Sequence, residues 1–183
     1  MAHTFDPAMA DRLEDAARYR YCSREELLAL LEPDAGDLIA DVGSGTGFYT
    51  RDVAPHADRV LGVDVQPAMH DRFREAGVPK NASLVSGSAG ALPLADACLD
   101  GALTTMTFHE IATDGALAEL GRVLVPGGRF VAVDWSSEGE AEAGPPIDDR
   151  QSAESAAAML DAAGFSVGRA RERPETFVVV AQH

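Results

Sequence analysis

A glycine-rich turn after an apolar run is the feature of this sequence that most clearly indicates chemistry. The run LIADV at residues 38–42 leads directly into GSGTG at residues 43–47. Glycines at alternate positions allow a tight backbone turn and let a ligand approach where a Cβ atom would clash. Asp64 ends the next apolar run, seventeen residues after Gly47, where a carboxylate can accept hydrogen bonds from the two hydroxyls of a ribose. These two features predict a nucleoside-binding site.

The spacing of the glycines narrows the choice of nucleoside cofactor. The dinucleotide fingerprint GxGxxG needs a glycine at position 48, which is Phe48 here, and no Gly-Lys-Ser/Thr of a P-loop follows the turn. The turn has no basic residue to meet a pyrophosphate, whereas Asp41, Asp64 and the net charge of −15 favour a cation. S-adenosylmethionine combines a ribose, an adenine and a sulfonium without a phosphate, so we expect it as the cofactor. A nicotinamide oxidoreductase is the alternative enzyme class.

Composition and charge exclude several other functions. The 183 residues carry 30 acidic side chains and 15 lysines and arginines, so nucleic acid and anionic membranes are unfavourable partners. All of these bases except Lys80 are arginine, and this bias together with the twofold acid excess favours a salt-adapted, halophilic protein. An ordinary acidic protein is the alternative.

The sequence also indicates a cytoplasmic protein without a metal site. No apolar run approaches the ~20 residues that span a bilayer, and residues 1–15 lack the basic start and apolar core of a signal peptide. Cys22 and Cys98 stand far apart and form no CxxC, so we expect neither a disulfide framework nor a zinc site.

Strand and helix signals alternate along most of the chain. Helical patterns cover residues 6–32, 46–54, 67–77, 113–124 and 152–163. Short apolar runs predict strands at residues 38–42, 59–65, 82–86, 99–105, 129–135, 165–173 and 176–182, with an acidic loop at 136–151. The alternation implies a parallel sheet, but the last two strands are too close for a helical crossover and must form an antiparallel hairpin. We therefore predict an α/β fold with a seven-stranded, mostly parallel sheet whose last strand is antiparallel.

Four segments in this order resemble the successive motifs of a known family. They are DVGSGTGFYT, VLGVDVQPAM, LPLADACLDGALTTMTFHEI and LGRVLVPGGRFVAVDW. They look like those of class I S-adenosylmethionine-dependent methyltransferases of type 11, the group similar to the ubiquinone/menaquinone-biosynthesis C-methyltransferases. The resemblance covers roughly residues 36–183, and the FDP start and the GPPIDDR segment are similar to short haloarchaeal members. It implies a Rossmann-like three-layer sandwich, with residues 1–35 as an N-terminal helical cover over a methyltransferase domain of residues 36–183, all within a single structural domain.

The resemblance also implies which residues bind the cofactor. Asp64 would hold the ribose hydroxyls, while Val65 and Gln66 would pack near the adenine. Asp41 either touches the cofactor or only caps the glycine-rich turn. The methionine and ribose end of the cofactor would lie against four residues of the turn, namely Gly43, Ser44, Gly45 and Gly47.

Three further positions complete the expected cofactor site. Ser88 and Ala89 stand where the family usually has an acid that contacts the adenine amino group, and a hydroxyl accepts a hydrogen bond more weakly than a carboxylate does. Met106, directly after the fourth predicted strand, would border the sulfonium and the incoming substrate.

The candidate for catalysis is His109. Methyl transfer from a sulfonium is an in-line displacement, so alignment and exclusion of water are the main tasks of the protein. A general base is needed only where the nucleophile must lose a proton, and His109 lies past the fourth predicted strand, near the expected methyl group. The alternative is a structural histidine that caps the next helix. Glu110 stays undecided, and Thr113 in place of a second histidine excludes an HExxH zinc site.

Together these features predict a methyltransferase that acts on a small molecule, with a pocket formed by residues 1–32 and the loop 136–150. A cofactor-binding module without catalysis is the alternative from another class, and the nicotinamide oxidoreductase is the weaker enzyme alternative. The acceptor and its attacking atom stay open. We also consider a homodimer that pairs through an apolar sheet edge.

Overall fold

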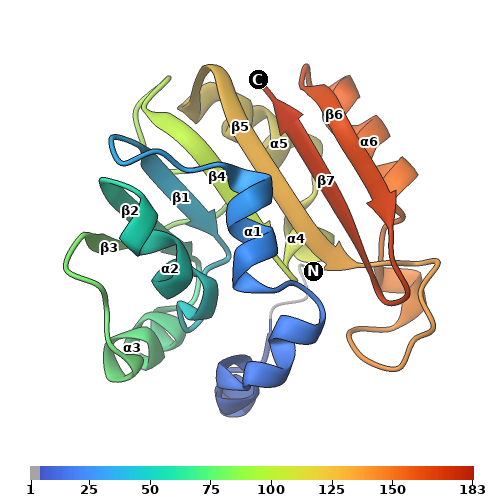
Figure 1. Ribbon diagram of the computed structural model, residues 1–183, viewed down its shortest axis with the longest axis horizontal. Coiled ribbons are helices and arrows are strands. Elements are labelled where there is room, and N and C mark those ends of the chain that lie inside the picture. Colours follow the sequence, from blue (N-terminus) through green and yellow to red (C-terminus); the bar gives the residue numbers. More distant parts are fainter. Residues whose placement is uncertain (1–4) are drawn as a thin grey trace.

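One sheet organises residues 5–183, the part of the chain that the computed structural model describes (Figure 1). Its seven strands are β1 Leu38–Val42, β2 Arg59–Asp64, β3 Ala82–Ser86, β4 Leu99–Thr105, β5 Leu124–Trp135, β6 Ser166–Glu172 and β7 Thr176–Gln182. Their order across the sheet is β3-β2-β1-β4-β5-β7-β6. The first five are parallel, and β7 runs antiparallel to both of its neighbours. The predicted fold class, with its antiparallel last strand, is confirmed.

Helices cover both faces of this sheet. The α-helices are α1 Arg24–Leu31, α2 Phe48–Val53, α3 Pro67–Ala76, α4 Phe108–Ile111, α5 Asp114–Val123 and α6 Ala153–Ala162, and the 3₁₀ helices are η1 Pro7–Glu14, η2 Ala16–Arg20, η3 Ala54–His56 and η4 Ile147–Asp149. Ile39 of β1 shares an apolar cluster with α1 and α2, whereas its neighbour Ala40 shares a second cluster with α5 and α6. Successive strand side chains point to opposite faces, so adjacent residues of one strand anchor the two outer layers of the sandwich.

The segment 6–32, which a helical pattern covers, is not one continuous helix. It divides into η1, η2 and α1, and each piece begins at a residue whose side chain accepts a backbone N–H two or three positions ahead, namely Asp6, Asp15 and Ser23. Short polar side chains compete for backbone N–H groups in this way and are favoured at helix starts. The segment is helical as predicted, but these capping residues start a new helix three times within one helical pattern.

β5 begins earlier than predicted. It starts at Leu124 rather than at Arg129, and its register with β4 shifts between the Leu99–Leu124 pair and the Gly101–Arg129 pair. One residue of β4, Asp100, thus lies opposite four of β5, residues 125–128 (VPGG), and the ladder is irregular there. The helix ends before Pro126-Gly127-Gly128 as predicted, but β5 begins directly after α5, before these three residues.

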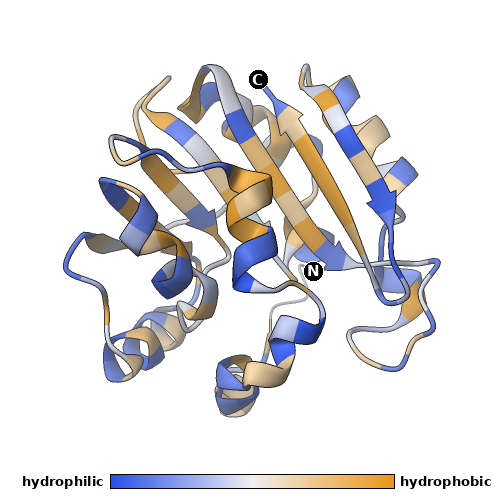
Figure 2. Ribbon diagram, viewed as in Figure 1, coloured by the Kyte–Doolittle hydropathy of each residue, from blue (hydrophilic) through white to orange (hydrophobic). Residues whose placement is uncertain are grey.

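Hydropathy follows the place of each strand in the sheet. Figure 2 shows β7 as almost entirely hydrophobic, and its first six residues are buried. β6, at the edge, is mostly exposed and carries Arg169 and Arg171. Among the helices of the described part, none is both long enough and apolar enough to span a bilayer.

Position 47 requires a glycine for two reasons. Gly47 has a φ of +79°, a left-handed conformation, directly before α2, and a Cβ atom there would lie 2.1 Å from the ring of Phe73 in α3. Left-handed backbone costs a residue with a side chain about 1–2 kcal/mol, and displacing a buried ring adds about 1–3 kcal/mol of overpacking strain. α3 therefore packs against the turn because position 47 carries no side chain.

We expect Gly47→Ala to lower the free energy of unfolding by about 2–5 kcal/mol, the sum of these two strains. Urea titration followed by circular dichroism measures the change. Gly36→Ala is the matched control, because a Cβ atom on Gly36 meets no atom within 4 Å and its backbone lies outside the left-handed region. Equal stability of the two variants would contradict the role given to Phe73.

Candidate active site

The carboxyl ends of β1, β2 and β4 meet at one edge of the sheet, and the glycine-rich turn lies there. Gly43, Gly45 and Gly47 have φ values of +78°, +53° and +79°. The turn is fixed to β2, because the N–H groups of Gly43 and Ser44 donate to the carbonyl of Val63 at 2.8 and 3.0 Å. β1 has β2 on one side and β4 on the other, so this is the switch point at which open α/β sheets bind ligands.

Protein side chains fill the space that two of these glycines leave open. A Cβ atom on Gly43 would lie 2.4 Å from Cγ2 of Thr107, and one on Gly47 would meet the ring of Phe73. At Gly45 the nearest atom is Cδ1 of Leu13, at 3.4 Å. The missing side chains of Gly43 and Gly47 therefore leave room for Thr107 and Phe73, and Gly45 is the least crowded of the three glycines.

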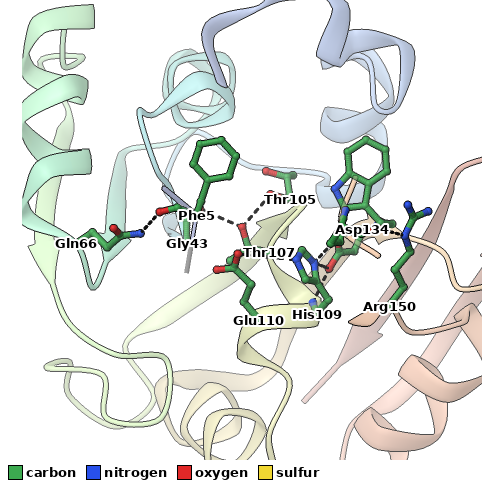
Figure 3. Close-up of polar contacts among 11 residues, drawn as sticks. Phe5, Gly43, Gln66, Thr105, Thr107, His109, Glu110, Asp134 and Arg150 are labelled. Carbon is green, nitrogen blue, oxygen red and sulfur yellow. Dashed lines mark hydrogen bonds and ion pairs between the residues drawn. The ribbon is translucent and has the colours of Figure 1, made fainter. Parts of the chain in front are cut away.

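Asp64 ends β2 and ties that strand to the turn. Its Oδ2 accepts a hydrogen bond from the N–H of Gly45 at 2.9 Å, and its Oδ1 accepts one from the N–H of Gln66 at 2.8 Å. A carboxylate oxygen has two lone pairs, so each oxygen keeps one acceptor direction. Beside it, Val65 is 55% exposed, and Nε2 of Gln66 donates to the carbonyl of Phe5 at 3.0 Å (Figure 3).

Asp41 lies buried beneath the turn and bonds α2 instead of capping the turn. Its Oδ2 accepts a 2.6 Å hydrogen bond from the hydroxyl of Thr50. Burial raises the pKa of Asp41 to about 6, and the charge of Asp64 adds to the rise, while Thr50 and Arg18 oppose it. Asp41 and Asp64 are therefore close enough to repel each other.

Three buried oxygens at the turn have no hydrogen-bond partner among residues 5–183. They are Oδ1 of Asp41, Oγ of Ser44 and Oγ1 of Thr46. Buried polar atoms without partners are rare in native proteins, and each one requires an explanation. A ligand with hydroxyl or ammonium donors would supply partners for this group of acceptors.

Ser88 and Ala89 lie in the loop after β3, and their side chains have different surroundings. The loop approaches Asp64, because the N–H of Gly87 donates to the Asp64 carbonyl at 3.1 Å. Ser88 is exposed, and its hydroxyl accepts from the N–H of Gly90 at 3.3 Å. The Ala89 side chain packs into the apolar cluster around α5. Of these two side chains, that of Ser88 is thus the one accessible to a ligand beside Asp64.

The N-terminal segment packs on α2 and on the turn. The guanidinium of Arg18, in η2, lies 5.1 Å from the ring centres of both Phe48 and Tyr49, and its NH1 donates to the carbonyl of Leu13. The Tyr49 hydroxyl donates to the carbonyl of Cys22 at 3.0 Å. These contacts hold η1 and η2 against the element that follows the turn.

The chain changes direction sharply after β4. Met106 has a φ of +58°, which residues with side chains rarely adopt, and its N–H donates to the carbonyl of Val133 in β5 at 2.8 Å. The hydroxyl of Thr107 lies 3.1 Å from the carbonyl oxygen of Thr105 and 3.4 Å from that of Gly43 (Figure 3). The bend after β4 and the glycine-rich turn after β1 are therefore in contact.

His109 and Asp134 form a hydrogen-bonded pair beside this contact (Figure 3). Nδ1 of His109 lies 3.0 and 2.9 Å from the two carboxylate oxygens of Asp134, which also accept the N–H groups of His109 and Trp135 at 2.6 and 2.7 Å. The Asp134 side chain is 0% exposed and that of His109 9%. A carboxylate only accepts hydrogen bonds, so Nδ1 carries a hydrogen and Nε2 is the free ring nitrogen.

Glu110 stands on the free side of this imidazole. Its Oε1 lies 3.9 Å from Nε2 of His109, and its side chain is 19% exposed. Burial raises the pKa of Glu110 to about 7, with Asp134 and Asp64 adding to the rise and His109 opposing it. Burial by itself lowers the pKa of His109, but the hydrogen bond and charge of Asp134, with Glu110 and Asp149, raise it overall. The titrations of the two groups are therefore coupled.

His109 was predicted from the sequence as a site residue, but Asp134 was not. β4 and β5 are parallel neighbours in which Thr105 pairs with Val133, so the residues that follow them come side by side. The available signal was an acid near the end of the apolar run RFVAVDW, a place like that of Asp64 in RVLGVDV. His109 lies inside α4, whose N-cap is Thr107, so it does not cap that helix.

Comparisons with known proteins agree with this fold. The family model described as a methyltransferase domain matches residues 40–132. An uncharacterized methyltransferase-like protein of Schizosaccharomyces pombe is 37% identical over 105 residues, which are 57% of this chain and 40% of that protein. A demethylmenaquinone methyltransferase of Corynebacterium kroppenstedtii is 32% identical over 108 residues, which are 58% of this chain and 45% of that enzyme. The matches thus span less than half the length of these curated relatives.

A solved structure is similar over almost its whole length. The crystal structure of a SAM-dependent methyltransferase from Aquifex aeolicus superimposes with a TM-score of 0.87 at 30% sequence identity. The match covers 98% of this chain and 99% of that chain. The sheet and its covering helices are therefore common to both proteins.

The buried Asp41 carboxyl makes the stability of the protein depend on pH. Its folded-state pKa of about 6 exceeds the ordinary value of 3.8. A group of this kind favours the folded state below about pH 4, and this contribution is lost as the pH rises through about 6.

We expect the free energy of unfolding of Asp41→Asn, relative to the wild type, to increase by about 2 kcal/mol between pH 4.5 and pH 7, because the variant has no charge to bury. Urea titrations at the two pH values measure this difference. Asp58→Asn, which removes an exposed carboxyl, supplies the baseline. A difference for Asp41→Asn that does not exceed this baseline would show that Asp41 is well solvated.

Proposed function

This chain belongs to the type 11 methyltransferase-domain family, and from that premise we propose that it transfers a methyl group from S-adenosylmethionine to a small-molecule acceptor. The observation that carries the proposal is the group of three partnerless buried oxygens at the turn, next to the carboxylate of Asp64. A demethylmenaquinone methyltransferase among the relatives is named for a small-molecule acceptor, which supports that substrate class.

The acceptor groups of the turn match the donors of this cofactor. When bound, S-adenosylmethionine supplies a methyl group on a sulfonium and presents two ribose hydroxyls and an ammonium. Each oxygen of Asp64 keeps one acceptor direction, and Oδ1 of Asp41 has no partner in the described chain. Because these two carboxylates repel each other, a cation held near them relieves the repulsion. Val65 and Gln66, directly after Asp64, are the residues that we assign to the adenine side.

We assign residues 1–35 to a cover over a methyltransferase domain of residues 36–183. Residues 1–4 lie outside the described residues. Two observations support this role: a Cβ atom on Gly45 would lie 3.4 Å from Cδ1 of Leu13 in η1, and Gln66 donates to the carbonyl of Phe5. A cover of this kind excludes water and so strengthens electrostatic interactions beneath it.

The loop of residues 136–150 is the second wall that we propose for the acceptor pocket. The side chain of Arg150 is 2% exposed and donates to the carbonyls of Ser136, Ala143 and Pro145. Its guanidinium carbon lies 5.8 Å from the ring centre of Trp135, the residue after Asp134. Arg150 thus holds the loop in one conformation beside the His109–Asp134 pair.

His109 is the base that we propose for acceptors that must lose a proton. With the hydrogen on Nδ1 directed at Asp134, the neutral ring accepts a proton at Nε2, and the Asp134 carboxylate stabilises the imidazolium that results. Alignment by the turn, the cover and the loop is the larger contribution to rate, since positioning alone lowers the barrier of a two-reactant step by up to ~7–11 kcal/mol.

Calorimetry in high-salt buffer tests the cofactor. We expect S-adenosylmethionine and its demethylated product to bind in the micromolar range, and NAD not to bind. Binding of NAD alone would overturn the proposal in favour of an oxidoreductase. Transfer of a labelled methyl group to members of a metabolite panel tests catalysis, and cofactor binding without any transfer would favour a non-catalytic binding module.

Asp64→Ala is expected to weaken S-adenosylmethionine binding at least tenfold, which corresponds to about 1.5 kcal/mol for lost charge-assisted hydrogen bonds. Since Asp64 also accepts the N–H groups of Gly45 and Gln66, circular dichroism accompanies the titration to verify the fold. Asp58→Ala, at an exposed carboxyl, is the matched control. An unchanged affinity would remove Asp64 from the proposed ribose contact.

A further inference from the structure

We propose that Asp134 positions His109 for removal of a proton from the methyl acceptor and that Glu110 then receives this proton, so that the attacking atom of the acceptor is one that carries a removable hydrogen. The inference rests on the proposed function and deepens it by naming a substrate class. Phenols, enols, thiols and carbons next to a carbonyl belong to this class, whereas thioethers and tertiary amines do not.

Asp134 holds both the main chain and the ring of His109. Its Oδ2 accepts the backbone N–H of His109 at 2.6 Å and lies 2.9 Å from Nδ1, while its Oδ1 lies 3.0 Å from Nδ1 and accepts the N–H of Trp135. A buried carboxylate is stable only when its oxygens are hydrogen-bonded, and here each oxygen accepts one backbone N–H while both lie near the single N–H of Nδ1. One group therefore fixes the start of α4, the orientation of the ring and its tautomer.

The free nitrogen of this ring faces a second carboxyl. Oε1 of Glu110 lies 3.9 Å from Nε2, and Glu110 is close enough to Asp64, at the end of β2, to be affected by its charge. Two residues before His109, Thr107 touches the glycine-rich turn (Figure 3). Nε2 and Glu110 therefore lie on the side of the pair that faces the turn, where the reacting groups would meet.

The proton transfers balance with these groups alone. The bond between the acceptor atom and its hydrogen breaks, the electron pair stays on the acceptor, and the proton adds to Nε2 of His109. The imidazolium then lies between the carboxylates of Asp134 and Glu110. Glu110, with a pKa of about 7, takes the proton from Nε2 and releases it to water, which its 19% exposed side chain reaches.

A merely structural histidine would not need this arrangement. The hydrogen bond from Nδ1 to Asp134 already satisfies the ring on one side, and a second, mostly buried carboxyl on the other side costs desolvation. The charged groups that act on the pair come from four elements: Asp134 of β5, Glu110 of α4, Asp149 of η4 and Asp64 of β2. All four are acids, so the surroundings favour a proton on the ring.

The first test is ¹⁵N NMR of histidine-labelled protein without ligand, with the His109 signals assigned by His109→Gln. We expect the neutral ring to carry its hydrogen on Nδ1 and to titrate above the ordinary midpoint of 6.5. Asp134→Asn is expected to lower this midpoint by about one pH unit or more, because a paired charge is lost. A neutral ring with its hydrogen on Nε2, or an unmoved midpoint in a folded Asp134→Asn, would overturn the proposal.

If Asp134→Asn does not fold, two other measurements test the proposal. These are the tautomer of the His109 ring in the wild type and the midpoint of the His109 titration in Glu110→Gln. Glu110→Gln removes the carboxyl on the exposed side, so it is expected to lower the midpoint of His109 by less than Asp134→Asn would. An unchanged midpoint would show that Glu110 and the ring are not coupled.

The second test measures methyl transfer to any acceptor found in the metabolite screen, as a function of pH. We expect kcat to fall about 100-fold or more in His109→Gln and about tenfold or more in Asp134→Asn and Glu110→Gln, the range of general base catalysis, with KM nearly unchanged. The acidic limb of the pH profile should move with the NMR midpoints. Asp148→Asn, an exposed acid on the neighbouring η4, is the matched control.

The outcomes separate this proposal from the proposed function. The affinity for the demethylated cofactor is expected to stay within twofold of the wild-type value in all variants. If the wild type does not bind this compound, the proposed function fails, whereas the NMR measurements still test the arrangement of His109, Asp134 and Glu110. A methylated product formed from a thioether or a tertiary amine would overturn the substrate class. So would kcat values and pH profiles that do not change, or cofactor binding without any transfer.

Discussion

The site depends on carboxylates that end parallel strands and are held there by backbone N–H groups. Asp64 accepts two such groups after β2, and Asp134 accepts two at the end of β5. Each bond joins the strand end to the chain that continues from it or from its neighbour. Burial of a carboxylate is costly without such partners, so the same bonds that keep these charges in place also fix the turn on one side and α4 on the other.

These fixed acids concentrate negative charge at the site. The charge of Asp64 raises the pKa of both Asp41 and Glu110 beyond the effect of burial, and that of Asp134 adds to the rise at Glu110. Such a concentration of negative charge attracts cations and favours protons on the groups within it. The affinity of the site for a positively charged ligand and the proton chemistry proposed at His109 therefore have the same physical origin.

The sequence predicted those features that depend on local pattern. Strands β1, β3, β4 and β7 have the predicted bounds, because short apolar runs end at turn residues. The segment 6–32 is helical as predicted, but three capping residues divide it into separate helices, which the helical pattern alone does not show. Features that depend on pairing between distant segments were not predictable from the spacing. Asp134 reaches His109 because β4 pairs with β5. No local sequence pattern shows that Thr107 and Phe73 fill the space beside Gly43 and Gly47.

The left-handed backbone of Met106 explains how one short segment, residues 106–109, contacts both the glycine-rich turn and Asp134. A non-glycine residue in this conformation costs about 1–2 kcal/mol, and here it is held by the bond from its N–H to Val133. An extended residue at this point would continue β4 past the sheet edge. The bend instead turns Thr107 to the glycine-rich turn and lets His109 reach Asp134. Strain at a single residue thus sets the distance between the proposed cofactor site and the proposed base, which is why it persists at this edge of the sheet.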